Sequence, residues 1–289
     1  AWAERRVRDV GAFIGFLLAG MILCLPGTTI SASKGVLSIW ARDFGLALFP
    51  FMVLCKMTAQ RLRSARFPAA PLAAQLGCMG GSLSGAAMLS VSSAGMAPSP
   101  LYALCALTGT ISPMFFVGTL HAWGVAQKTC LCLLAAHGLG ALSAFVCVRR
   151  LSPVMEKVAA RETPEKANGN SITDSVFSVL GVGGCIVFFS VAAACIRILF
   201  PFLPETGCAY LQSVLEIAGG MRLLIQTSSA SFARDVSMAV LTGFGGLSIL
   251  TQNHLFLQVC GVTQGRLLCL ALLRALMSGA VMALLLWLI

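Results

Sequence analysis

The stretch GGSLSGAAMLSVSS, Gly80 to Ser93, guides the interpretation of the whole chain, together with a weaker counterpart, GFGGLSILTQ, at Gly243 to Gln252. Both stretches are apolar enough to enter a bilayer, yet both are richer in glycine and small hydroxyl side chains than a helix that faces lipid. Non-helical backbone at membrane depth is tolerated only where protein or a water-filled cavity covers it. Paired interruptions, one in each half of a chain, point to the binding site of a transporter. The alternative is close helix packing, because small residues let two transmembrane backbones approach each other.

The composition predicts an all-α, polytopic helical membrane protein. Hydrophobic residues make up 58% of the 289 and charged residues only 10%, against about 25% charged in soluble domains. The mean hydropathy is +0.90. The net charge of +10 comes from basic residues that cluster between apolar runs, where the positive-inside rule places them on the cytoplasmic side. We therefore expect contact with a lipid bilayer and no nucleic-acid partner, because no basic patch is interleaved with aromatic residues.

The twelve cysteines predict neither a metal site nor another cofactor. Most of them lie inside apolar runs and none forms a C-x-x-C pair. Buried cysteine behaves as a small hydrophobic residue. No P-loop, nucleophile elbow or zinc-protease motif is present, so we expect no catalytic residues and no enzyme.

The charge distribution predicts two membrane halves. Residues 1–150 form the first half, 151–174 a hydrophilic cytoplasmic linker, and 175–289 the second half. If residues 72–97 crossed the membrane fully, the basic linker would fall outside; a re-entrant helical hairpin at 72–97 keeps it inside. A second hairpin is expected at 236–259, and if 210–231 does not cross fully, the halves form an inverted repeat.

Glu216 is the sharpest polar candidate within an apolar segment, with Gln212 one turn earlier and Gly220 one turn later. Ionisable residues inside membrane segments are costly, so each is a functional candidate, although an interfacial acid that reaches water is equally open. Arg222, Arg234 and Arg274 are candidate partners for an anionic substrate, because a guanidinium matches a carboxylate. Arg197 lies near a span end and is interpreted as interfacial.

Serine hydroxyls and the free N–H groups of broken helix ends complete the expected site. The predicted substrate-binding residues are Gly81, Ser82, Ser84, Gly85, Ser112, Glu216, Arg222, Gly245, Gly246, Ser248 and Gln252.

Short motifs along nearly the whole chain resemble the YlbJ family of sporulation integral membrane proteins, also called SpoVV, within a wider group that has nucleoside-recognition or gate domains. These motifs are FPFMVL at 49–54, SGA at 84–86, SPMFFVGT at 112–119, LEIAGG at 215–220 and GFGGLS at 243–248. The chain departs from the family at Leu83, where a proline is usual, and at Gly109 and Thr110, where asparagines are usual.

The resemblance implies a multi-pass protein of the outer forespore or cell membrane of a spore-forming bacterium, needed for spore cortex formation. It further implies transport of a small organic anion, dipicolinic acid, as the substrate. Two alternatives stay open: a nucleoside-type transporter, and a sporulation scaffold that transports nothing.

Overall fold

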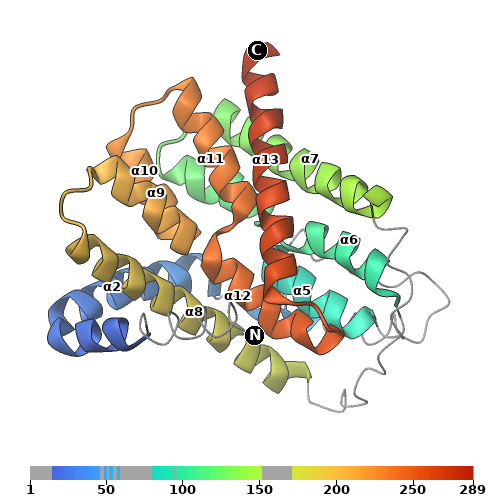
Figure 1. Ribbon diagram of the computed structural model, residues 1–289, viewed down its shortest axis with the longest axis horizontal. Helices are drawn as coiled ribbons and strands as arrows, with labels where there is room; N and C mark the ends of the chain where they lie inside the picture. Colours follow the sequence, from blue (N-terminus) through green and yellow to red (C-terminus); the bar gives the residue numbers. More distant parts are fainter. Residues whose placement is uncertain are drawn as a thin grey trace, which may run out of the picture.

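The computed structural model describes residues 15–45, 49–50, 52–54, 57–58, 80–93, 96–151 and 171–288. Within these ranges the protein is all-α and contains no strand (Figure 1). The α-helices are α2 (Pro26–Ile39), α5 (Ser82–Ser92), α6 (Pro98–Thr108), α7 (Gln127–Leu151), α8 (Ser171–Leu199), α9 (Glu205–Leu215), α10 (Ile217–Thr227), α11 (Phe232–Phe244), α12 (Gly246–Leu257) and α13 (Gln264–Leu288). Short π-helical segments η1 (Trp40–Gly45) and η2 (Phe115–Leu120) and a 3₁₀ turn η3 (Gln258–Cys260) join them.

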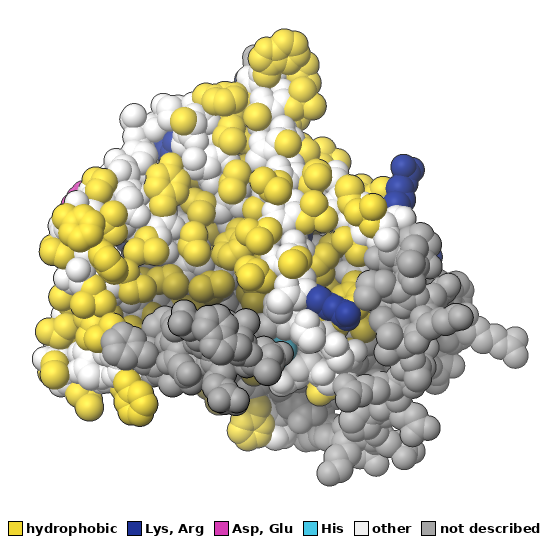
Figure 2. Space-filling view, in the orientation of Figure 1, with side chains coloured by type: hydrophobic (Ala, Val, Ile, Leu, Met, Phe, Trp, Pro, Cys, Tyr) yellow, Lys and Arg dark blue, Asp and Glu magenta, His cyan; other side chains and the backbone are white. Residues whose placement is uncertain are grey.

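Among the residues that the structure describes, three helices are long and apolar enough to cross a membrane: Gln127–Leu151, Ser175–Leu199 and Gln264–Leu288, each of 25 residues. Such a helix is about 37 Å long, which exceeds the roughly 30 Å of bilayer hydrocarbon. Leu272, Leu276 and Trp287 of α13 point outward and are exposed. Figure 2 shows apolar side chains over most of the described surface on this side of the molecule. These features confirm a helical membrane protein.

The two long helices α7 and α13 cross at Gly140, where the absence of a side chain lets the backbones approach. A Cβ atom added to Gly140 of α7 would lie 2.7 Å from the main-chain nitrogen of Ser278 in α13. Gly243 of α11 meets the same serine from a second side, with its Cβ position 2.8 Å from Ser278 Oγ. Three backbones therefore meet at Ser278, as close membrane packing of small residues predicts.

Helices α5 and α6 form an antiparallel pair. Gly81, just before α5, faces Ser112, and Gly85 faces Thr108 at the end of α6. Residues 81 and 85 advance along the chain while their partners 112 and 108 recede, so the two helices run in opposite directions. The predicted hairpin at 72–97 is only partly covered, because residues 72–79 and 94–95 lie outside the described ranges. Its described part, residues 80–93 and 96–97, contains the single helix α5, and α6 begins directly after it at Pro98.

The second half contains a tighter helical pair and a broken helix. Helices α9 and α10 fold back on each other at Glu216, and Gly220 packs directly against the main chain of Ser213. The predicted hairpin region 236–259 contains α11 and α12, which meet at Gly245. In the second half, the two helices that fold back on each other are therefore α9 and α10, which cover residues 205–227.

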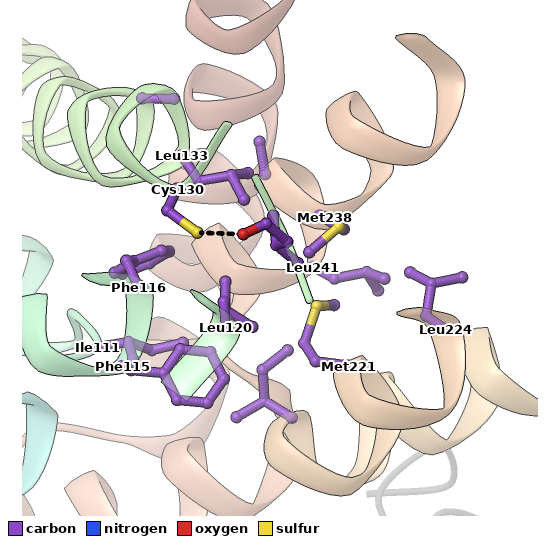
Figure 3. Close-up of a cluster of buried hydrophobic side chains, with 14 of the residues drawn as sticks. Ile111, Phe115, Phe116, Leu120, Cys130, Leu133, Met221, Leu224, Met238 and Leu241 are labelled. Carbon is purple, nitrogen blue, oxygen red and sulfur yellow. Dashed lines mark hydrogen bonds between the residues drawn. The ribbon is translucent and has the colours of Figure 1, made fainter. Parts of the chain in front are cut away.

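The apolar core joins the two halves. One cluster contains Phe115, Phe116 and Leu120 of η2 together with Met221 of α10 and Met238 of α11 (Figure 3). A second cluster brings α5 and α6 against α12 and α13. The breaks between the helices therefore lie next to packed apolar side chains from both halves.

Helix α2 begins at a proline, and one predicted boundary differs from the structure. Pro26 is the first residue of α2. Proline suits the first turn of a helix, where its missing N–H has no partner to lose. The linker predicted at 151–174 lies largely outside the described residues, and α8 already begins at Ser171.

Candidate functional site

Four interruptions of the helices define the candidate site. They are Gly81 before α5, residues 109–112 after α6, Glu216 between α9 and α10, and Gly245–Gly246 between α11 and α12. Gly81, Gly245 and Gly246 have φ values of +91°, +85° and +83°. Side chains with a Cβ atom rarely adopt this conformation, so glycine is what permits these breaks.

The first two interruptions meet. A Cβ atom on Gly81 would lie 3.3 Å from the main-chain nitrogen of Ser112 and 3.4 Å from its Cβ. Ser112 precedes Pro113, and the residue before a proline is biased away from the helical conformation. The structure thus places Gly81 against Ser112, and Gly85, one turn further along α5, against Thr108.

Glu216 forms the tip of the α9–α10 pair. Its backbone is extended, and its carboxylate accepts hydrogen bonds from the N–H groups of Ala218 at 2.8 Å and Gly219 at 2.7 Å. The side chain is only 2% exposed. It makes no ion pair with any residue in the described part of the chain. Glu216 is therefore the N-terminal cap of α10, and this local role satisfies its oxygens inside the protein.

The tip of α9–α10 touches the α11–α12 break. A Cβ atom on Gly246 would lie 3.2 Å from the carbonyl oxygen of Ser213 and 3.4 Å from the nitrogen of Ile217. The predicted residues Glu216 and Gly246 thus belong to one junction. Helix interruptions of the second half therefore pack backbone against backbone, as those of the first half do at Gly81.

Three of the last four carbonyl groups of α6 accept hydrogen bonds from side chains. The last four carbonyls of a helix have no partner within it. Thr108 donates to the oxygen of Cys105 at 3.2 Å, Thr110 to that of Leu107 at 2.9 Å, and Arg274 to that of Ala106 at 3.3 Å. The break after α6 is therefore built by Thr108 and Thr110, which the predicted site did not include, and by Arg274, which was expected to contact a substrate.

Arg274, which was expected to contact an anionic substrate, is buried and bonded to main-chain carbonyl groups in this structure. It is 4% exposed. Besides Ala106, its Nε donates to the carbonyl oxygen of Gly243 at 3.3 Å, and its guanidinium fills the space beside Gly109. One positive charge thus contacts the C-terminal ends of both α6 and α11, where helix dipoles favour a cation. Arg234 is likewise engaged, because it pairs with Asp235 at 2.9 Å.

His137 occupies a position on α7 that corresponds to the position of Arg274 on α13. It lies ten residues after the first residue of α7 (127 to 137), and Arg274 lies ten residues after the first residue of α13 (264 to 274). The ring Nε2 of His137 accepts the N–H of Ile111 at 2.9 Å. Both side chains therefore hold main chain at a break, one by accepting and one by donating a hydrogen bond.

The remaining predicted polar residues are buried and bonded within the protein. Ser84 donates to the sulfur of Met52 at 3.5 Å, and Gln252 donates to the hydroxyl of Ser248 at 3.0 Å. Gln252 also borders a hollow of about 240 Å³ against Gly181 and Val182 of α8. The hydroxyl of Ser84 and the side chains of Ser248 and Gln252 are therefore engaged within the protein.

Arg222 lies elsewhere, in a cavity of about 320 Å³ between α2, α8, α9 and α10. Its polar lining comprises Ser31, Ser190, Arg197, Gln212, Arg222 and Gln226. Gly219, whose N–H bonds to Glu216, forms part of the wall. The cavity therefore reaches the Glu216 tip from outside. Neither the Gly81–Ser112 contact nor Gly246 belongs to its lining.

Sequence reasoning missed Arg197 and Ser190 as part of this cavity. The available signal was their spacing: Ser190, Ala193, Ala194 and Arg197 follow the i, i+3, i+4, i+7 pattern of one helix face. Gly219, Arg222, Leu223 and Gln226 repeat that pattern on α10. Only the fold shows that these two faces meet.

No family model, curated protein or solved structure matches the chain. Within the described residues, no group of three or more His, Cys, Asp or Glu side chains could hold a metal ion.

Proposed function

We propose that the protein is a secondary carrier of small organic anions. The observation that carries this proposal is the junction in the second half, where the α11–α12 break at Gly246 lies against the Glu216 tip of α9–α10. Interrupted helices that meet within a membrane protein are how many secondary transporters build their substrate path, because the broken ends expose main-chain groups to bind it.

The correspondence of α6–η2–α7 with α11–α12–α13 supports a repeated unit. Helix α7 begins 19 residues after α6 ends (108 to 127), and α13 begins 20 residues after α11 ends (244 to 264). Each unit contains a helix, a break, a short helical segment and a 25-residue span. We infer that the halves are inverted repeats, an architecture that lets one half rock against the other.

An anion suits the charges near this junction. Arg197 and Arg222 line the cavity beside the Glu216 tip. Dipicolinic acid, with two carboxylates on a flat ring, is the first substrate to test, because the resemblance to the sporulation family implies it. The corresponding cellular role is movement of this acid across the outer forespore membrane during cortex formation.

The test is uptake of radiolabelled dipicolinate by proteoliposomes that contain the purified full-length protein, compared with empty liposomes. The carrier proposal expects saturable uptake that unlabelled dipicolinate abolishes and uridine leaves unchanged. Uptake that uridine competes away would identify a nucleoside carrier. Absence of any flux, with the protein correctly folded in the liposomes, would favour the non-transporting scaffold.

A further inference from the structure

The cavity beside Arg222 is built from one face of each of four helices. Small residues on these faces make the room: Ser31 and Gly35 on α2, Ala193 and Ala194 on α8, and Gly219 on α10. Its volume of about 320 Å³ falls at the lower end of the range for small-molecule sites, about 300–1,000 Å³. The space therefore suits a small ligand better than a peptide.

Two cationic side chains of this cavity have no partner in the described structure. Arg197 and Arg222 form no hydrogen bond or ion pair with another described residue. One acidic residue, Glu205, shares an adjoining cavity with Arg197 and makes no ion pair with it. The lining thus offers two forked guanidinium groups, which recognise carboxylates through paired hydrogen bonds.

Ser190 supplies an independent sign of a ligand-binding site. It is 6% exposed, lines the cavity, and its hydroxyl has no hydrogen-bond partner. A buried hydroxyl without a partner is unfavourable and calls for a bound group. The amides of Gln212 and Gln226 add further donors on the facing wall.

We propose that the cavity between α2, α8, α9 and α10 binds a small organic carboxylate, with Arg197 and Arg222 holding its charge and Ser190 donating to its inner end. The identity of this ligand as the transported substrate rests on the proposed function. A ligand bound in this cavity would contact the junction of Glu216 with Gly246 through Gly219, a wall residue that donates its N–H to Glu216 at 2.7 Å.

A lipid phosphate shares the same chemistry and competes for the same arginines. The depth of the cavity favours the free anion. Ser190 lies seven residues before Arg197 on α8 (190 to 197), which is about 10 Å along a helix. An anion that reaches Ser190 must therefore leave the helix end and pass about two turns inward.

The test measures binding of radiolabelled dipicolinate to the full-length protein in nanodiscs of phosphatidylcholine. Arg197→Gln and Arg222→Gln are each expected to raise the Kd about tenfold or more, because each removes a charge-assisted hydrogen bond. Ser190→Ala is expected to give a smaller increase. Arg150→Gln, which removes the same charge from the exposed end of α7, is the matched control and should leave the Kd unchanged.

An unchanged Kd in both arginine variants overturns the proposal. So does a result in which nanodiscs containing phosphatidylglycerol abolish dipicolinate binding and the arginine variants lose only the lipid. Arg222→Lys, which keeps the charge and loses the fork, guards against a misfolded variant and should bind with intermediate affinity.

The outcomes separate the site from the proposed function. If the wild type binds dipicolinate and the variants do not, but no flux occurs in proteoliposomes, the site stands and the carrier function fails. If flux occurs and survives in both arginine variants with unchanged affinity, the carrier function stands and the site fails.

Discussion

Arg274 of α13 donates from Nε to the carbonyl oxygen of Gly243 in α11, across 3.3 Å. The same guanidinium donates to Ala106 of α6. One side chain therefore bonds to the C-terminal ends of α6 and α11, which belong to different halves of the chain. A buried arginine is costly to place in an apolar interior, and these bonds to helix ends are what stabilise it there.

Replacing Arg274 with methionine keeps most of its volume and removes these donors. The carbonyls of Ala106 and Gly243 would each lose this donor, and we expect a destabilisation of about 2–4 kcal/mol. Thermal unfolding of the detergent-solubilised protein measures it. Arg266→Met, at an exposed arginine that stacks on Tyr102 with 4.3 Å between guanidinium carbon and ring centre, is the control. A melting temperature equal to that of the control would contradict the role of Arg274 in holding these helix ends.

The crossing of α7 and α13 can be tested with two glycines of the same helix. In Gly140→Ala the new methyl group meets Ser278, whereas in Gly138→Ala it meets nothing within 4 Å. We expect Gly140→Ala to destabilise the protein by about 1–3 kcal/mol through overpacking, and Gly138→Ala to be neutral or stabilising by about 0.5–1 kcal/mol. Unfolding midpoints of the two variants decide the matter. Equal effects would mean that the two helices do not cross at residue 140.

The junction at Gly246 allows a similar comparison. Both Gly246 and Gly261 have positive φ values, +83° and +78°, but only Gly246 has main chain within 4 Å of its Cβ position. Gly261→Ala should show the backbone strain alone, about 1 kcal/mol. Gly246→Ala should cost more, and it should also reduce uptake of dipicolinate in proteoliposomes, because it separates the break from the Glu216 tip. A Gly246→Ala variant with wild-type stability and flux would remove the junction from the mechanism.

The cap at Glu216 makes a prediction about local opening. Glu216→Ala leaves the N–H groups of Ala218 and Gly219 without their acceptor, which should cost about 1–2 kcal/mol. Glu216→Gln retains one acceptor oxygen and should lose less. Hydrogen exchange of the peptide that covers α10 should accelerate in that order, with Glu205→Gln, at an exposed acid, as the reference. Unchanged exchange in Glu216→Ala would show that the cap does not hold this turn.

Much of the arrangement follows from local sequence. Hydropathy and length depend only on consecutive residues, and they account for the three spans in α7, α8 and α13. The breaks at Gly81 and Gly245 follow from glycine's freedom at positive φ. Glu216 was marked as functional because an acid inside an apolar stretch is unusual, but its role as a helix cap depends on an extended backbone that the pattern does not reveal.

Side chains that act across the fold were not predictable in the same way. Arg274 was expected to contact a substrate, and its bonds to the ends of α6 and α11 were not foreseen, because both helices are distant from it in sequence. Arg197 was assigned to an interface, and the structure places it on the wall of a cavity that also contains Arg222. Each of these outcomes depends on which helix faces meet.

By itself the sequence determined the class of the protein, a helical membrane protein, and the breaks at Gly81 and Gly245, since hydropathy and glycine act over a few neighbouring residues. The tertiary structure alone decided which breaks touch, which arginine is buried against helix ends and which two remain open in a cavity. The physical reason is that contacts between helices depend on close packing of backbones at Gly140, Gly220 and Gly246, and such packing joins residues that no local pattern relates.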